Sequence, residues 1–107
     1  MNRTDTSAVA SLATRLNALA HPARLCILTH LAQQGCCACC KDVVSKLDLA
    51  QSTVSQHLKI LVDAGLVRHT RQGTRSLYEI DSLALEALSG SVTHFLAKCT
   101  ADPCAIG

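Results

Sequence analysis

Four thiols lie within one short stretch of the chain, Cys36-Cys37-Ala38-Cys39-Cys40. The stretch holds two overlapping Cys-x-x-Cys spacings, and at the start of a helix its thiols could enclose one ion. Such a position also lowers the pKa of a thiol, and the thiolate is the form that binds metal. Thiolates select soft ions such as Zn(II), Cu(I), Cd(II) and trivalent arsenic or antimony. The alternative is that these cysteines are small apolar residues of the core. It fits Cys26, but it does not fit four thiols beside Gly35, because exposed cysteine without a role is a liability.

Two further thiols, Cys99 and Cys104, lie near the C-terminus and are separated by Thr-Ala-Asp-Pro. This spacer lets the chain turn, so the pair could supply two thiolates to a metalloid or form a disulfide. The odd cysteine count and a polar N-terminus without a signal peptide argue against a disulfide framework. We therefore expect reduced thiols in a cytoplasmic protein, with these candidate metal ligands: Cys36, Cys37, Cys39, Cys40, Cys99 and Cys104.

The composition limits the kind of fold that can position these thiols. The 107 residues are 49% hydrophobic but only 2% aromatic, so an aliphatic core is expected, which favours helix packing over a β-sandwich. A charged content of 17% and a mean hydropathy of +0.25 exclude wholesale disorder. No apolar run approaches the roughly 18–20 residues of a membrane span, so no membrane partner is expected.

Apolar residues at helical spacing predict the first two elements. A helix over 9–19 carries apolar side chains three or four positions apart: Val9, Leu12, Leu16 and Leu19. Pro22 suits the first turn of a second helix that ends near Gly35. We expect this helix to bury Leu25, Leu28 and Leu31.

The later part of the chain predicts two short helices, a hairpin and a last helix. The two short helices are separated by a turn at 48–50, and the second, from about Gln51 or Ser52 to Gly65, buries Val54, Leu58 and Leu61. Two β-compatible segments, 66–71 and 75–80, flank a turn that contains Gly73. A last helix over 82–99 follows. It is capped by Asp81 or Ser82 and has a stripe that includes Leu85, Leu88, Val92, Phe95 and Cys99.

This order is that of a winged helix-turn-helix, in which the second helix of the pair enters the major groove of DNA. The side of that helix away from its apolar stripe carries hydroxyls for phosphates, an amide able to pair with adenine, and a cation: Ser52, Thr53, Ser55, Gln56 and Lys59. The hairpin adds cations, expected around its tip: Arg68, Arg71 and Arg75. Residues 41–75 hold six basic against three acidic residues, whereas 76–107 hold one against four. A DNA-binding surface is therefore predicted.

The histidines leave alternatives open. His57 either contacts a phosphate or packs against the preceding helix and holds the turn. His21, His30 and His69 are interpreted as surface or capping residues, because none has a ligand-like neighbour at helical spacing.

Three segments resemble the ArsR/SmtB family of metal-sensing repressors: His21-Pro22-Ala23-Arg24-Leu25, the run Ser52–Leu61, and Ala64-Gly65-Leu66-Val67. The resemblance spans about residues 9–98. It implies a homodimer paired through the first and last helices, which binds operator DNA, blocks transcription and is released by an inducer. The apolar stripes of helices 9–19 and 82–99 also favour dimerisation, because a domain of this size offers limited core for both and large apolar patches rarely stay exposed. The alternative is that both helices complete the core of the monomer. A two-fold dimer predicts operator half-sites about 34 Å apart.

The resemblance also bears on the inducer. Many arsenic- and cadmium-responsive members carry Cys-x-Cys at the start of the third helix. Cys39 matches the first of these cysteines, but Lys41 replaces the second, so Cys40, Cys37 or Cys36 would have to substitute. Zinc-responsive members use Asp-x-His and His-x-x-Glu on the last helix. Asp81 and His94 match, but two ligands are replaced, by Leu83 and Ala97, which disfavours zinc there.

We therefore expect residues 1–107 to form one winged helix-turn-helix domain, with the helix-turn-helix over 39–64 and the wing over 66–80. The expected function is a repressor without a required cofactor, released when As(III), Sb(III) or another soft ion binds cysteine thiolates. An alternative is a redox- or persulfide-responsive repressor that uses Cys26 and Cys99. A remoter alternative is a Cys-x-x-Cys redox enzyme or metal buffer, although such an enzyme needs a strand before its motif.

Overall fold

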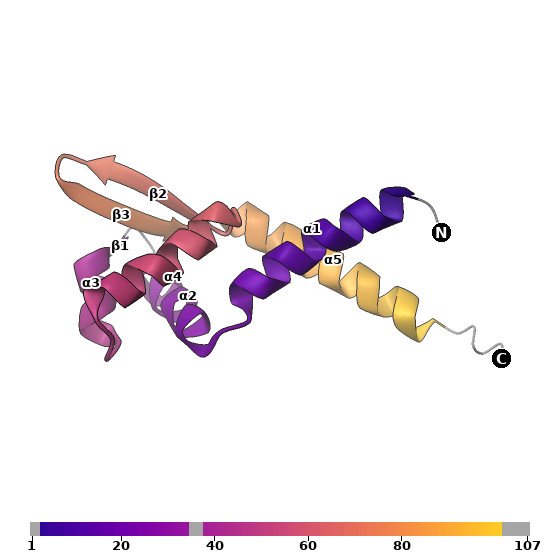
Figure 1. Ribbon diagram of the computed structural model, residues 1–107, viewed down its shortest axis with the longest axis horizontal. Coiled ribbons are helices and arrows are strands. Elements are labelled where there is room, and N and C mark those ends of the chain that lie inside the picture. Colours follow the sequence, from indigo (N-terminus) through magenta and orange to yellow (C-terminus); the bar gives the residue numbers. More distant parts are fainter. Residues whose placement is uncertain (1–2, 35–37, 102–107) are drawn as a thin grey trace.

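The structure is a computed structural model that describes residues 3–34 and 38–101. The described residues form five helices and three strands (Figure 1): α1 Arg3–Leu19, α2 Pro22–Gln34, β1 Ala38–Cys39, α3 Cys40–Lys46, α4 Gln51–Asp63, β2 Val67–Gln72, β3 Arg75–Ile80 and α5 Ser82–Thr100. The predicted class, mostly helical with a hairpin wing, is confirmed.

The molecule is elongated, with extents of 57 × 24 × 23 Å. Its radius of gyration is 16.7 Å, whereas about 13 Å is typical of a globular chain of 100 residues. Figure 1 shows the cause: α2, α3, α4 and the β2–β3 hairpin form one body, and α1 and α5 cross and extend away from it. These two helices therefore have much of their surface outside the body that holds the core.

The core is aliphatic, as the composition predicts. Six fully buried side chains from α2, α3, α4 and the start of the hairpin form its centre: Ile27, Val43, Val54, Leu58, Leu61 and Leu66. Leu12 and Ala18 of α1 and Leu88 of α5 join the same cluster. The inward face predicted for α4 is confirmed, and it fixes which of its side chains face outward.

Two predictions for the first helices are wrong in part, although Leu31 is buried as predicted. The helix α1 begins at Arg3, six residues before Val9, because an apolar stripe locates the packed turns and not the polar turn that precedes them. On α2 the buried residues are Ile27, His30 and Leu31, while Leu25 is 51% exposed. Apolar residues occur all around this helix, so contact with α3 and α4 selects the buried face.

The sheet contains a strand that the sequence did not predict. Its order is β1-β3-β2, and β1 pairs antiparallel with β3 through Ala38–Tyr78 and Cys39–Leu77. A two-residue strand has no detectable periodicity. Cys39 ends this strand and is also the N-cap residue of α3.

Turns and caps delimit the elements that carry the site. Gly65, after the last turn of α4, and Gly73, in the two-residue hairpin turn, have φ of 82° and 66°, which favours glycine at both positions. The Asp81 side chain accepts a hydrogen bond from Ala84 N at 3.1 Å and caps α5, as predicted. No helix among the described residues is both long enough and apolar enough to cross a membrane.

Candidate nucleic-acid interface and thiol site

The outward side of α4 forms one continuous polar surface. Residues three and four positions apart are neighbours on a helix, and the exposed residues at this spacing are Ser52, Ser55, Gln56 and Lys59. Thr53 is half-buried at the edge of this surface. Because Val54, Leu58 and Leu61 are fully buried, the hydroxyl, amide and ammonium groups point away from the core. We call this set, with Thr53 at its edge, the outer face of α4.

One carboxylate lies close to the outer face of α4. Lys59 Nζ is 3.2 Å from Asp63 Oδ2, and the two side chains are 75% and 63% exposed. Asp63 is the last residue of α4, so it lies one turn beyond Lys59. An exposed i,i+4 ion pair contributes only about 0.3–0.5 kcal/mol, so Lys59 can exchange Asp63 for a phosphate.

The register of the hairpin separates its arginines. Arg71 pairs with Ser76, and Arg75 pairs with Gln72. Since side chains alternate between the faces of a strand, Arg71 and Arg75 extend from opposite faces near the tip. Arg68 does not lie at the tip as predicted. It pairs with Glu79, and its Nη2 is 3.5 Å from Glu79 Oε2.

His57 contacts Arg24 of α2 and His21, the residue that precedes α2. Its Nδ1 accepts a hydrogen bond from Arg24 Nε at 3.2 Å, and its ring lies 4.5 Å from the ring of His21. Burial, and then the charges of His21 and Arg24, lower the pKa of His57 below its ordinary value of 6.5. These contacts support a packing role rather than a phosphate contact, but the partners are Arg24 of α2 and His21 and not the preceding helix α3.

The other histidines divide between capping, surface and core. His21 Nδ1 accepts a hydrogen bond from Ala23 N at 3.0 Å at the start of α2, so it is a capping residue as predicted. His69 is exposed and stacks on Tyr78 with ring centroids 4.7 Å apart. His30 is buried, and its Nε2 has no hydrogen-bond partner in the described part of the chain. The surface interpretation of His30 is therefore wrong, because it lies on the side of α2 that faces the core.

Cys39 is held by Asp42 at the start of α3. Cys39 Sγ and Cys39 N both donate to Asp42 Oδ2, at 3.3 and 3.2 Å. These two hydrogen bonds lower the pKa of the Asp42 carboxyl, and the more distant charges of Arg75 and His30 lower it further. The thiol therefore lies beside an ionised carboxylate.

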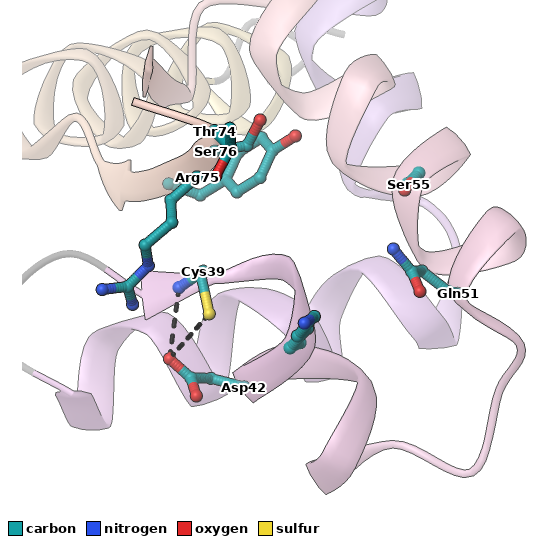
Figure 2. A pocket seen from close by; sticks show the side chains of 9 residues that line it. Cys39, Asp42, Gln51, Ser55, Thr74, Arg75 and Ser76 are labelled. Carbon is teal, nitrogen blue, oxygen red and sulfur yellow. Dashed lines mark hydrogen bonds between the residues drawn. The ribbon is translucent and has the colours of Figure 1, made fainter. Parts of the chain in front are cut away.

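Cys39 also borders a cavity between α3, α4 and the hairpin. Its volume is about 460 Å³, and residues of all three elements line it, among them Cys39, Lys41, Ser55 and Arg75. Figure 2 shows Arg75 extending from β3 towards Cys39 and Asp42, with Gln51 and Ser55 across from them on α4. The candidate metal ligand Cys39, Ser55 of the outer face of α4 and the wing arginine Arg75 thus line one cavity.

The remaining candidate ligands are only partly described. Cys36, Cys37 and Cys104 lie outside the described residues, as does the side chain of Cys40. Over 3–34 and 38–101, no three His, Cys, Asp or Glu side chains form a group that could hold a metal ion. The thiols of the redox alternative, Cys26 and Cys99, are exposed. They belong to α2 and the last turn of α5, which are apart in Figure 1.

An apolar groove runs between α1 and α5. It has a volume of about 350 Å³ and is lined by Val9, Leu12 and Phe95, with Arg15, His94 and Lys98 at its sides. Val9 is 49% exposed and Phe95 40% exposed. The groove therefore leaves apolar side chains in contact with water.

A helix pair with an outward polar second helix, followed by a hairpin with arginines near its tip, defines the winged helix-turn-helix class of DNA-binding regulators. The sequence model of the family described as "Bacterial regulatory protein, arsR family" matches residues 21–69. The arsenical resistance operon repressor of Bacillus subtilis is 34% identical over 89 residues, which cover 82% of this chain and 83% of that protein. The chain belongs to the ArsR family of transcriptional repressors, as the resemblance implied.

Solved structures agree with this assignment. An ArsR-like transcriptional regulator from a Rhodococcus species, 23% identical, superposes with a TM-score of 0.74 over 86% of this chain and 85% of its own, which establishes the fold. A homodimeric winged helix-turn-helix DNA-binding domain from Mycobacterium bovis is 30% identical, with a TM-score of 0.70 over 88% of each chain.

Proposed function

We propose that this ArsR-family protein is a repressor that binds operator DNA as a homodimer and dissociates when a thiophilic ion binds its cysteines. The proposed inducer is As(III) or Sb(III), or another soft metal ion that binds thiolates. The observation that carries the proposal is the shared cavity, which Cys39 lines together with Ser55 of α4 and Arg75 of the wing. An ion bound through Cys39 changes the surroundings of two DNA-binding elements at once.

The outer face of α4 supports the DNA-binding part of the proposal. In a major groove, Gln56 presents an amide to base edges, and Ser52, Ser55 and Lys59 present donors to phosphates. The groove between α1 and α5 supports the homodimer, because a second copy would cover Val9 and Phe95 and place two α4 helices on one duplex. The homodimeric relative from Mycobacterium bovis supports the same assembly.

The thiols and one relative support the choice of inducer. The cysteine stretch 36–40 and the pair Cys99 and Cys104 provide soft ligands, and trivalent arsenic takes two or three thiolates. The Bacillus subtilis relative is named as a repressor of an arsenical resistance operon. A difference in ion affinity between free and DNA-bound protein of about 1–3 kcal/mol weakens DNA binding about 5- to 150-fold.

The experiment that tests the proposal measures release from DNA by fluorescence anisotropy. The labelled probe is a duplex from upstream of the protein's own gene, and the protein is kept reduced. Arsenite is expected to release the duplex under these conditions. Release only by peroxide or polysulfide would favour the redox alternative. If the protein binds no such duplex at low salt, the repressor assignment is contradicted.

The wing arginines are expected to contribute through phosphates. Replacing Arg71 or Arg75 with alanine should weaken binding to all sequences by a similar factor. The slope of log K against log salt should fall by about 0.9 for each lost phosphate contact, hence about twice that in a symmetric dimer. Arg68→Ala is the matched control, because the Arg68 guanidinium is paired with Glu79 away from the tip. A loss confined to one operator sequence would contradict this role.

A further inference from the structure

Arg24 joins three elements of the fold. It lies in the first turn of α2, and its Nη1 donates to the carbonyl oxygens of Asn17 and Ala18, at 3.0 and 3.3 Å, near the end of α1. Its Nε donates to His57 Nδ1 of α4 at 3.2 Å. A planar guanidinium has donors in fixed directions, so one side chain fixes the end of α1 relative to α4.

His57 receives this hydrogen bond from the inner side of α4. Its ring is half-buried against His21, while the neighbouring Gln56 is exposed on the outer face. Leu58, the next residue, is fully buried. The contact therefore acts on the part of α4 that is buried against α2, behind the outer face of α4.

We propose that Arg24 is a positioning residue for DNA binding, which couples the end of α1 to α4 through His57 Nδ1. This inference rests on the proposed DNA binding and dimerisation. If α1 pairs with the partner copy, the hydrogen bonds of Arg24 to the end of α1 and to His57 set the orientation of each α4 helix relative to the dimer axis. The spacing of the two α4 helices then matches operator half-sites only while this contact is formed.

The contact requires a neutral imidazole. Protonation of His57 converts Nδ1 from an acceptor into a donor, which then faces the N–H donor of Arg24. The charged and titratable groups that act on His57 are His21, before α2, and Arg24, on α2, and both disfavour the imidazolium. The fold holds the pKa of His57 below 6.5. The contact between Arg24 and the neutral His57 therefore contributes its full stabilisation above pH 6.5, and this stabilisation is lost as the pH falls through the lowered pKa.

The sign of the pH effect separates two roles of His57. As an acceptor for Arg24, His57 loses its contact in acid, so operator affinity should fall. As a phosphate contact, His57 would gain charge in acid, so operator affinity would rise and its salt dependence would steepen. The same titration on the same protein therefore gives opposite results for the two roles.

The test uses the full chain and the operator duplex, with affinity measured by anisotropy between pH 7.5 and 5.5. Wild-type affinity should fall as the pH drops through the lowered pKa of His57, and complete loss of the contact is worth about ten-fold, the scale of one hydrogen bond to a charged group. His57→Asn keeps an oxygen acceptor near the Nδ1 position and cannot titrate, so it should bind normally at pH 7.5 and lose this dependence. His69→Asn, which changes an exposed histidine of the wing, should keep the wild-type profile.

A double-mutant cycle isolates the hydrogen bond between Arg24 Nε and His57 Nδ1. Arg24→Lys and His57→Phe should each weaken binding about ten-fold at pH 7.5, and the double variant should be no weaker than either alone. Additive losses, an unchanged pH profile in His57→Asn, or tighter wild-type binding in acid would overturn the inference. Circular dichroism and sedimentation at each pH confirm that folded dimers are compared. If the wild type binds no operator at pH 7.5, the proposed function fails and this inference falls with it.

Discussion

Replacing Cys39 and Cys40 together with serine is expected to abolish release by arsenite and leave operator affinity within about two-fold of the wild type. A serine hydroxyl at position 39 can still donate to Asp42 Oδ2, as Cys39 Sγ does at 3.3 Å, so the cap of α3 is preserved. The hydroxyl does not bind trivalent arsenic as a thiolate does. The wild-type response of about 5- to 150-fold should therefore disappear.

The measurement is an arsenite titration of the protein–DNA complex in reducing buffer. Cys26→Ser is the matched control, because this exposed thiol lies on α2 outside the cysteine stretch, and it should release DNA normally. Normal release by the Cys39 and Cys40 double variant would contradict the prediction and move the sensor to Cys99 and Cys104. Arsenite bound to each variant, counted by native mass spectrometry, separates lost binding from lost coupling.

Phe95→Asp should convert the protein to a monomer and weaken operator binding by at least about 100-fold. Phe95 lines the apolar groove between α1 and α5, where we propose that the second copy packs. Loss of a buried phenylalanine ring costs about 3–5 kcal/mol, the substitution also places a charge in the apolar interface, and each 1.4 kcal/mol is a factor of ten in a dissociation constant. The two-fold axis introduces this charge twice.

Sedimentation equilibrium measures the dimer dissociation constant, and anisotropy measures operator affinity. Leu25→Asp is the matched control: Leu25 is 51% exposed and lines a different surface, beside Cys26 and Lys46. This variant should remain dimeric. A Phe95→Asp protein that is still a dimer with normal affinity would show that the copies pair through another face.

Prediction from sequence succeeded where one residue pattern permits one arrangement. On α4, the spacing of Val54, Leu58 and Leu61 admits a single buried stripe, and the same spacing leaves Ser55 and Gln56 outward. The hairpin was predictable because Gly73 lies between two β-compatible segments. The Asp81 cap was predictable because a carboxylate before a helix accepts its first N–H groups.

Prediction failed where several neighbours compete for one element. The buried face of α2 depends on the positions of α3 and α4, so Leu25 was wrongly assigned to the core and His30 to the surface. The strand β1 exists only because β3 offers Tyr78 and Leu77 as pairing partners. Neither fact has a local signal, because each depends on residues far apart in the chain.

The amino-acid sequence alone determined the order of the five helices and the hairpin, the resemblance to the family, and which types of group lie on α4, on the wing and in the cysteine stretch. These properties depend on periodicity and residue type, which are local. Only the tertiary structure decided that Arg71 and Arg75 extend from opposite faces of the hairpin, that Cys39 shares a cavity with Ser55, and that Arg24 binds His57. Strand register and helix packing set these relations, and both depend on long-range contacts that minimise buried polar groups and fill the core.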